Sequence, residues 1–176
     1  GKNGGITVSG GEPLLQIDFL LDLFRKAKER GISTALDTAG QPFTREKPFF
    51  SKFRELMQYT DLLLLDIKHI DPVEHKKLTG KPNANILDLF RFLSDMEKPV
   101  WIRYVLVPGI TDGDGYLQKT REFIRTLHNV QKIEVLPYHS MGEYKWKELG
   151  IPYSLEGVKP PDKTSVQRAE RILRGE

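Results

Sequence analysis

Hydrophobic and polar positions follow two alternating periods along this chain. Short β-prone apolar runs are followed by stretches in which apolar residues recur every three or four positions, a pattern that predicts strands followed by helices. The predicted strands are Ile6–Ser9, Ile32–Asp37, Leu62–Lys68, Val100–Val107 and Lys132–Leu136. The predicted helices are Gln16–Arg30, Glu46–Gln58, Ala84–Glu97, Asp114–His128 and Lys163–Arg174, with a further short one around Pro72–Leu78. This alternation is typical of an α/β fold with a parallel sheet and right-handed crossovers.

Within the predicted strands, residues two apart share a face of the sheet. One face gathers the polar residues Ser9, Asp37, Asp66, Lys68, Arg103 and Glu134. The opposite face carries Leu36, Leu63, Leu65, Ile67, Ile102, Tyr104 and Leu106. A doubly wound sheet would be apolar on both faces. The polar face instead predicts a partial (βα) barrel with outer helices and a polar interior that holds a ligand. Five strands are too few for the eight-stranded barrel, so we expect an open arc.

The first predicted strand ends in a glycine turn. Gly10 and Gly11 follow the strand, and Pro13 suits the first turn of the helix that runs on to Gly31. Glycine amides that open into a helix N-terminus are a common binding site for anionic or polar ligands in α/β proteins. A plain strand-to-helix turn is the alternative interpretation.

Polar residues also stand where other strands end, the edge at which parallel α/β proteins place their chemistry. Asp37, Lys68 and His139 are in such positions. Taken singly, they could equally be a helix cap, a solvated lysine and a loop histidine. Arg103 lies in mid-strand between Trp101 and Val105, so its guanidinium needs an anionic partner. Asp37, Asp66 or a ligand carboxylate could supply one.

Composition narrows the class of protein. A chain of 176 residues with 39% hydrophobic content predicts a single domain over residues 1–176. The net charge of +3, without a basic stripe, argues against nucleic acid, and no apolar run is long enough to cross a membrane. We therefore expect a cytoplasmic protein. No residue is cysteine, which excludes disulfides and thiolate metal ligands within this chain.

Two further features carry expectations. Residues 140–161 have no periodicity and predict a long loop, whose aromatic residues argue against disorder. The loop could cover the open end of the arc, receive a protein partner, or be fixed to the outer surface. His69, His75 and His128 are predicted to lie on the surface. No histidine pair has a spacing typical of metal ligands.

Seven motifs, spread in order over nearly the whole chain, resemble those of the radical S-adenosylmethionine (SAM) enzymes, and among them the glycyl radical activating enzymes. The motifs are Ser9-Gly10-Gly11-Glu12-Pro13 with Gln16, Asp37-Thr38-Ala39-Gly40, Leu65-Asp66-Ile67-Lys68, Trp101-Ile102-Arg103-Tyr104-Val105, Val107-Pro108-Gly109, Leu136-Pro137-Tyr138-His139 and Gly157-Val158-Lys159-Pro160-Pro161. The double glycine is shared across the superfamily, whereas the combination of the runs at Trp101–Val105, Pro137–His139 and Gly157–Pro161 is much more specific. The stretch Gln41–Phe53 is longer than the family pattern needs.

The resemblance implies a partial (βα)₆ barrel whose strand ends bind SAM. The residues matching the family's SAM-binding positions are Gly10, Gly11, Glu12, Asp37, Asp66, Ile67, Lys68, Arg103 and His139. The glycine turn would meet the amino group, the charged residues the methionine end, and His139 the nucleoside. Asp37, Thr38 and Asp66 match a site for a monovalent cation.

The family also has a Cys-x₃-Cys-x₂-Cys motif, upstream of the glycine turn, that binds a [4Fe–4S] cluster. This chain lacks it and begins at Gly1, so we expect a piece of a longer protein whose cluster-binding segment is missing here. On its own the chain should be inactive.

In the longer protein, the resemblance implies reductive cleavage of SAM and a 5′-deoxyadenosyl radical that takes a hydrogen from a glycine of pyruvate formate-lyase. Flavodoxin or ferredoxin would donate the electron. The alternatives are activation of a different glycyl radical enzyme, or a non-radical (βα) barrel that binds a nucleotide or phosphate.

Overall fold

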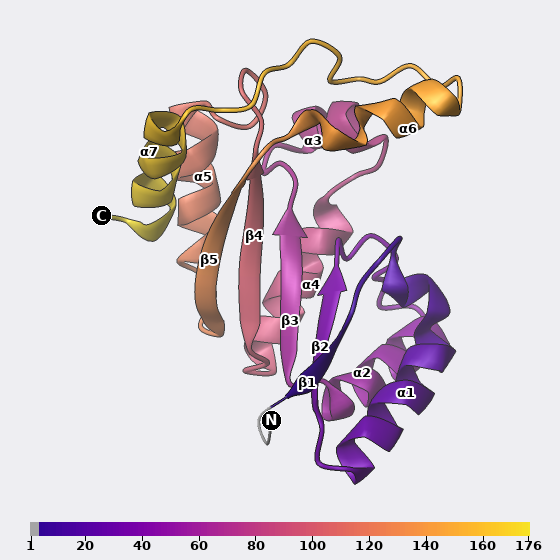
Figure 1. Cartoon of the computed structure of the whole chain (residues 1–176). Coiled ribbons are helices and arrows are strands. Elements are labelled where there is room, and N and C mark those ends of the chain that lie inside the picture. Colours follow the sequence, from indigo (N-terminus) through magenta and orange to yellow (C-terminus); the bar gives the residue numbers. More distant parts are fainter. Residues whose placement is uncertain (1–3) are drawn as a thin grey trace.

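The computed structural model describes residues 4–176, in which five parallel strands form one sheet (Figure 1). The strands are β1 (Gly5–Val8), β2 (Ser33–Thr38), β3 (Leu62–Ile67), β4 (Val100–Leu106) and β5 (Val130–Pro137). They are neighbours in the order of the sequence, so β1 and β5 are the two edges. The predicted α/β fold with an open, unclosed arc is therefore confirmed, with strand ends shifted by two residues at most.

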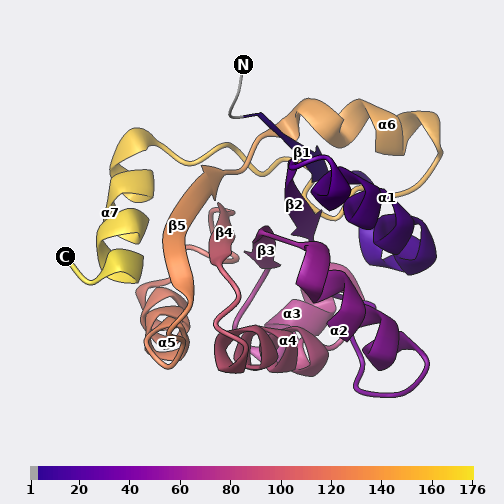
Figure 2. The same cartoon turned by 90° about the horizontal axis from the view of Figure 1, so that it is seen from below.

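Helices connect successive strands, and two more follow the last strand. They are α1 (Ile17–Glu29), α2 (Phe49–Tyr59), α3 (Pro72–Thr79), α4 (Ala84–Asp95), α5 (Asp114–Ile124), α6 (Glu143–Glu148) and α7 (Lys163–Arg174), with short 3₁₀ turns η1 (Pro13–Gln16) and η2 (Ser140–Gly142). Viewed from below the sheet, α1, α2, α4 and α5 lie on one side of the curved strands and leave the other side open (Figure 2). All six helices expected from the sequence are present, although α5 ends at Ile124 rather than at His128.

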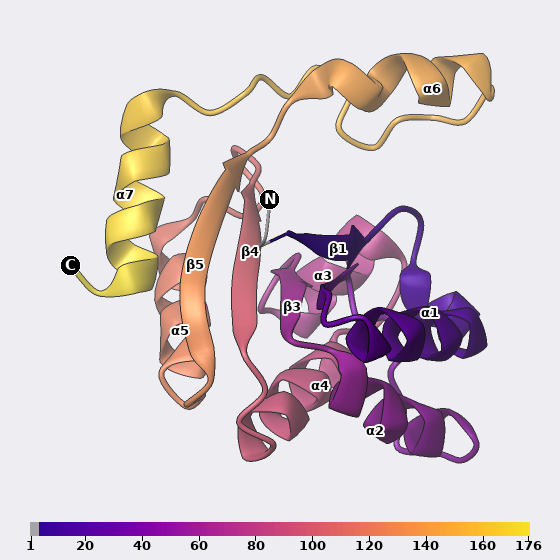
Figure 3. The ribbon, with the colours of Figure 1, turned by 60° about the horizontal axis from the view of Figure 1, so that its bottom comes forward.

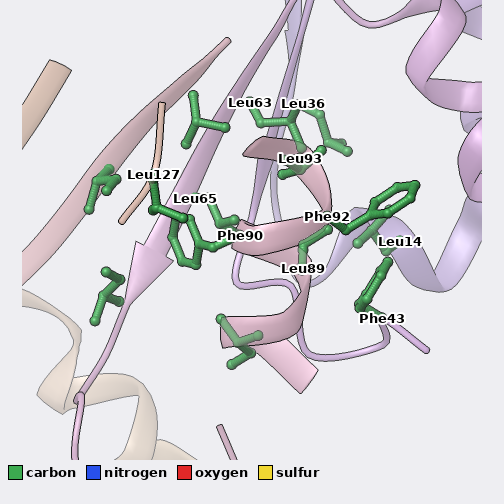
Figure 4. Packing of buried hydrophobic residues seen from close by; sticks show 14 of the residues in the cluster. Leu14, Leu36, Phe43, Leu63, Leu65, Leu89, Phe90, Phe92, Leu93 and Leu127 are labelled. Carbon is green, nitrogen blue, oxygen red and sulfur yellow. The ribbon is translucent and has the colours of Figure 1, made fainter. Parts of the chain in front are cut away.

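The hydrophobic core lies between the sheet and these outer helices. Leu36, Leu63, Leu65 and Ile102 are fully buried on the helix side of the strands. Figure 4 shows this layer packed against Leu89, Phe90 and Leu93 of α4. Burial of a large side chain of this kind is worth about 1.5–3 kcal/mol, so the apolar face of the sheet is a substantial stabilising part of the core.

An aromatic cluster accounts for part of the stretch Gln41–Phe53. Phe43 is 2% exposed, and its ring centroid lies 5.3 Å from that of Phe53 and 5.9 Å from that of Phe92. The extra residues before α2 thus carry a side chain that closes the core over α4, which is a packing role (Figure 4).

Residues 140–161 differ from the expected irregular loop, because they begin with η2 and the short helix α6. Figures 1 and 3 show α6 beyond the carboxyl ends of the strands. The segment is tied back to β5 by the hydroxyls of Tyr138 and Tyr153, 2.9 Å apart, and the Trp146 ring lies 5.7 Å from the Tyr153 ring. Six helical residues with few apolar anchors give too weak a period to predict from sequence.

The surface placement of His69 and His75 was wrong. Each is only 1% exposed. Both imidazoles bond to backbone groups, which lowers the cost of burying them, although His75 Nε2 has no hydrogen-bond partner among the described residues. His128 is exposed, as predicted.

Candidate functional site

The glycine turn after β1 has an open backbone in a conformation that favours glycine. Gly10 and Gly11 have φ angles of +96° and +55°, which L side chains rarely adopt. No atom lies within 4 Å of the position that a Cβ would take at either glycine. Both residues are exposed, and η1 begins at Pro13 immediately afterwards. The turn therefore presents backbone groups, without side chains, at the carboxyl end of β1.

Glu12 fastens this turn to the end of β2. Its Oε1 accepts hydrogen bonds from the Leu14 amide (3.1 Å) and the Thr38 hydroxyl (2.5 Å), and its Oε2 accepts one from the Ala39 amide (3.0 Å). The Gly40 amide in turn donates to the Thr38 hydroxyl at 2.9 Å. The Glu12 carboxylate is thus engaged by the chain itself, and its visible effect is to hold the two strand ends together.

Four side chains from three strands form a charged cluster on the open face: Asp37, Asp66, Lys68 and Arg103. Arg103 donates from Nη1 to Asp37 Oδ2 (2.8 Å), from Nη2 to Asp37 Oδ1, and from Nε to Asp66 Oδ1 (2.9 Å). Lys68 Nζ lies 2.7 Å from Asp66 Oδ2. Asp66 and Arg103 are paired in register on β3 and β4. The prediction that these four residues share one face is confirmed.

Exposure separates the members of the charged cluster. The side chains of Asp66, Asp37 and Arg103 are 8%, 19% and 20% exposed, whereas that of Lys68 is 35% exposed. The guanidinium of Arg103 is bonded at all three nitrogens, and its anionic partners are both Asp37 and Asp66. Lys68 has a single partner and more contact with solvent, so it is the cation best able to meet a ligand.

The side chains of the other predicted site residues take no part in the charged cluster. Ile67 is 2% exposed and packs in the core, so only its backbone could meet a ligand. The Thr38 side chain is likewise buried, and the two carboxylates of the suggested cation site are both bound by Arg103. His139 is exposed just beyond β5, and no hydrogen bond or ion pair within residues 4–176 joins it to the charged cluster.

A second pair lies on the same face, towards the other end of β4 and β5. Lys132 forms an ion pair with Glu134, and its Nζ lies 4.6 Å from the centroid of the Trp101 ring. Glu134 is paired in register with Arg103. The polar face predicted from alternation is therefore built of two adjoining ion-paired groups.

Three buried polar residues escaped the sequence reasoning as site neighbours: His69, His75 and Asn83. They surround the backbone that follows Lys68. An Asn before a helix reads as an ordinary cap, and nothing in the local pattern shows that its amide reaches back to β3. The only available signal was a run of polar residues next to a predicted ligand-binding lysine.

Among residues 4–176, no group of three or more histidine, aspartate or glutamate side chains is placed to hold a metal ion. With no cysteine in the sequence, thiolate ligands are lacking as well. No helix in the described part of the chain is long and apolar enough to cross a membrane.

Comparison with known proteins gives one family throughout. The family model for the radical SAM superfamily matches residues 1–124. The pyruvate formate-lyase-activating enzyme of Streptococcus mutans is 56% identical over 176 residues, which are 100% of this chain and 67% of that protein. The enzyme of the same name from Listeria monocytogenes is 54% identical over 172 residues, covering 98% of this chain and 69% of its own length.

Solved structures agree on the fold. A domain of a pyruvate-formate lyase-activating enzyme from Bacteroides vulgatus superposes with a TM-score of 0.78 at 28% identity, covering 98% of this chain and 94% of that one. SuiB of Streptococcus suis, solved with S-adenosylmethionine bound, has a TM-score of 0.70 at 17% identity over 97% of this chain and 36% of its own. At that identity the second match shows the fold alone. The chain spans about two thirds of the length of the curated relatives.

Proposed function

The chain belongs to the radical SAM superfamily, and from this premise we propose that it is the SAM-binding part of an enzyme that generates the glycyl radical of pyruvate formate-lyase. The identity of 54–56% over nearly the whole chain supports this choice of target. The observation that carries the proposal is the juxtaposition of the charged cluster with the bare backbone of Gly10 and Gly11 at the strand ends.

The residues fit the amino acid end of SAM, which carries a carboxylate and an ammonium group. Lys68 offers a partly exposed cation for the carboxylate, and a charge-assisted hydrogen bond of this kind is worth about 1.5–3 kcal/mol. Gly10 and Gly11 offer backbone carbonyls for the ammonium group, with open space beside them. Asp37, Asp66 and Arg103 would form a rigid ion-paired surface beneath this end of SAM, and His139 would lie towards the nucleoside.

The residues do not fit the [4Fe–4S] cluster that the family uses, because the chain has no cysteine. When bound, such a cluster supplies the electron for the reductive cleavage of SAM. The contribution of this chain is to bind and orient SAM. Glu12 takes part in that contribution through the glycine turn that it fastens.

A monovalent cation at Asp37, Thr38 and Asp66 belongs to the same proposal. Its carboxylate ligands would be shared with Arg103, which already binds both aspartates. Thr38 would contribute its carbonyl, since its hydroxyl is engaged by Glu12. We further propose pyruvate formate-lyase as the protein partner, flavodoxin or ferredoxin as the electron donor, and the cytoplasm as the location.

Titration of the 176-residue chain with SAM, followed by amide chemical shifts, tests the proposal. We expect the largest shifts at Gly10, Gly11 and Lys68. Lys68→Met should weaken binding by about tenfold or more, the equivalent of one charge-assisted hydrogen bond. The matched control is Lys52→Met, because Lys52 is 37% exposed and also lies 2.7 Å from a single aspartate, but on the helix side of the sheet.

Shifts confined to residues outside the strand ends would refute the proposed site. Equal SAM affinities for the Lys68→Met and Lys52→Met variants would refute the role of Lys68. Loss of SAM affinity in Lys68→Met, with none in Lys52→Met, would support both the proposed site and the role of Lys68.

A further inference from the structure

A group of uncharged polar side chains lies directly after Lys68, buried beneath the end of β3. We call His69, His75 and Asn83 the turn clamp. Their exposed fractions are 1%, 1% and 3%. They come from the segment after β3, from α3 and from the residue before α4, and Figure 1 shows these elements together at the carboxyl end of β3. Buried polar groups in such numbers are costly unless they bond to one another or to the backbone.

Two members of the turn clamp bind the backbone of the turn itself. Asn83 Nδ2 donates to the carbonyl oxygens of Ile70 (2.9 Å) and His69 (3.2 Å). His75 Nδ1 lies 3.3 Å from the same His69 carbonyl oxygen. A carbonyl can only accept, so His75 Nδ1 carries a proton. Burial lowers the pKa of His75, which favours the neutral ring with that single proton.

The third member joins two strand ends. His69 Nδ1 accepts a hydrogen bond from the Asp71 amide (3.0 Å), so its proton resides on Nε2, which lies 3.2 Å from the Ile110 carbonyl oxygen. The ring also packs edge-on against Tyr116, with centroids 4.4 Å apart. Ile110 follows β4, the strand of Arg103. The turn clamp therefore links the two strands that carry most of the charged cluster.

We propose that the turn clamp positions Lys68 for its contact with SAM. Lys68 is a long, flexible side chain whose only ion-pair partner in the described structure is Asp66. Where its ammonium group can reach depends on the backbone that immediately follows β3, and the turn clamp fixes that backbone at His69 and Ile70. Displacements of about 1 Å in supporting residues can cost a site much of its activity. The three residues touch no ligand and are positioning residues.

This inference rests on the proposed function, because it concerns the SAM contact of Lys68. A purely structural role for the turn clamp would lower the stability of the fold but leave the affinity of the folded protein for SAM unchanged. A positioning role would make the effect of the turn clamp depend on Lys68, which a double-mutant cycle measures directly.

The experiment measures SAM affinity by amide shifts for the 176-residue chain, and for Asn83→Ala, Lys68→Met and the double variant. We expect Asn83→Ala to weaken binding by about tenfold on its own, within the usual range of coupling between interacting residues. In the Lys68→Met background it should cause no further loss. The matched control is Asn129→Ala, which removes a buried bond from Nδ2 to the Lys98 carbonyl (2.6 Å) just before β5. That variant should lose stability and keep its SAM affinity.

Unchanged SAM affinity in Asn83→Ala, or a full tenfold loss in both backgrounds, would overturn the inference. If Asn83→Ala does not fold, His69→Asn takes its place in the cycle: an asparagine keeps an acceptor for the Asp71 amide but loses the bond to Ile110. A wild-type chain that does not bind SAM would refute the proposed function. Binding that depends on Lys68 but not on Asn83 would refute the positioning role alone.

Discussion

Replacement of Arg103 by leucine is the most informative single perturbation of the charged cluster. The change removes three charge-assisted hydrogen bonds at once: two to Asp37 and one to Asp66. Leucine keeps an apolar stem in the space between β3 and β4, so the packing of the strand is disturbed little. The consequence is therefore mainly electrostatic.

The two aspartates would not suffer equally. Asp66 keeps Lys68, 2.7 Å away, whereas Asp37 loses its partner on the open face while remaining only 19% exposed. Removal of one member of a buried ion pair costs about 3–5 kcal/mol, because the other charge is left uncompensated. The partial exposure of Asp37 places this case at the lower end, so we expect the free energy of unfolding to fall by about 3 kcal/mol.

Urea denaturation followed by circular dichroism measures this change from the midpoint of the transition. The control is Lys52→Met, which breaks an ion pair whose aspartate, Asp18, is 73% exposed and should cost less than about 1 kcal/mol. The double variant Arg103→Leu with Asp37→Leu removes the uncompensated charge. It should be more stable than Arg103→Leu alone.

A loss of less than about 1 kcal/mol in Arg103→Leu would show that Asp37 finds solvent or another partner without Arg103. A double variant less stable than the single one would show that the cost arises from lost packing. Either result would refute the view that Arg103 neutralises the aspartates beneath the site.

Three other outcomes can be checked. Phe53→Ala should cost about 3–5 kcal/mol in the urea assay, since Phe53 is fully buried in the aromatic cluster, while Phe19→Ala, at a position 59% exposed, should change stability by about 0.5 kcal/mol or less. Burial raises the pKa of Tyr104 to about 12, above its unfolded value of about 10, so stability that is present below pH 10 should be lost as the pH rises towards 12. The free energy of unfolding of a Tyr104→Phe variant should depend less on pH over that range. An equal pH dependence in both proteins would contradict the raised pKa of Tyr104. Anaerobic reconstitution of the chain with iron and sulfide, followed by SAM and reductant, should give no bound iron and no 5′-deoxyadenosine, because it has no cysteine; stoichiometric iron with SAM cleavage would be evidence against this.

The alternation of strands and helices and the polar face could be predicted because each rests on local periodicity. Alternation within β3 and β4 separates Asp66 and Arg103 from Leu65 and Ile102, and burial follows the same division in β4. In β3 Asp66 is buried like Leu65, because Arg103 and Lys68 both bind its carboxylate. When parallel strands pair, residues on the same face lie beside one another across the sheet, so the polar residues were expected to be neighbours. The pairing of Arg103 with both aspartates was one of the open alternatives, since sequence cannot tell a protein carboxylate from a ligand carboxylate.

The turn clamp could not be predicted in the same way. His69 and His75 are six positions apart, and Asn83 lies a helix further on. Their bonds run to backbone carbonyls, which every residue has, so the sequence offers no complementary residue type to look for. The bond of Glu12 to Thr38 has the same character, since it joins the cap of η1 to the last residue of β2, 26 residues further on. Tertiary hydrogen bonds of this kind are set by how the strand ends meet.

The charged cluster divides its tasks between two cations, and the division follows from their contacts. Arg103 is bonded at all three nitrogens and 20% exposed, so its charge is already balanced by Asp37 and Asp66. Lys68 is 35% exposed and shares Asp66, which is also bound by Arg103. An incoming carboxylate would therefore compete for Lys68 with a partner that Arg103 also binds, which lowers the cost of releasing the ammonium group. On this reasoning, substitution of Arg103 should mainly lower the stability of the fold, and substitution of Lys68 should mainly lower the affinity for SAM. The reverse order would mean that the guanidinium, not the ammonium group, meets the ligand.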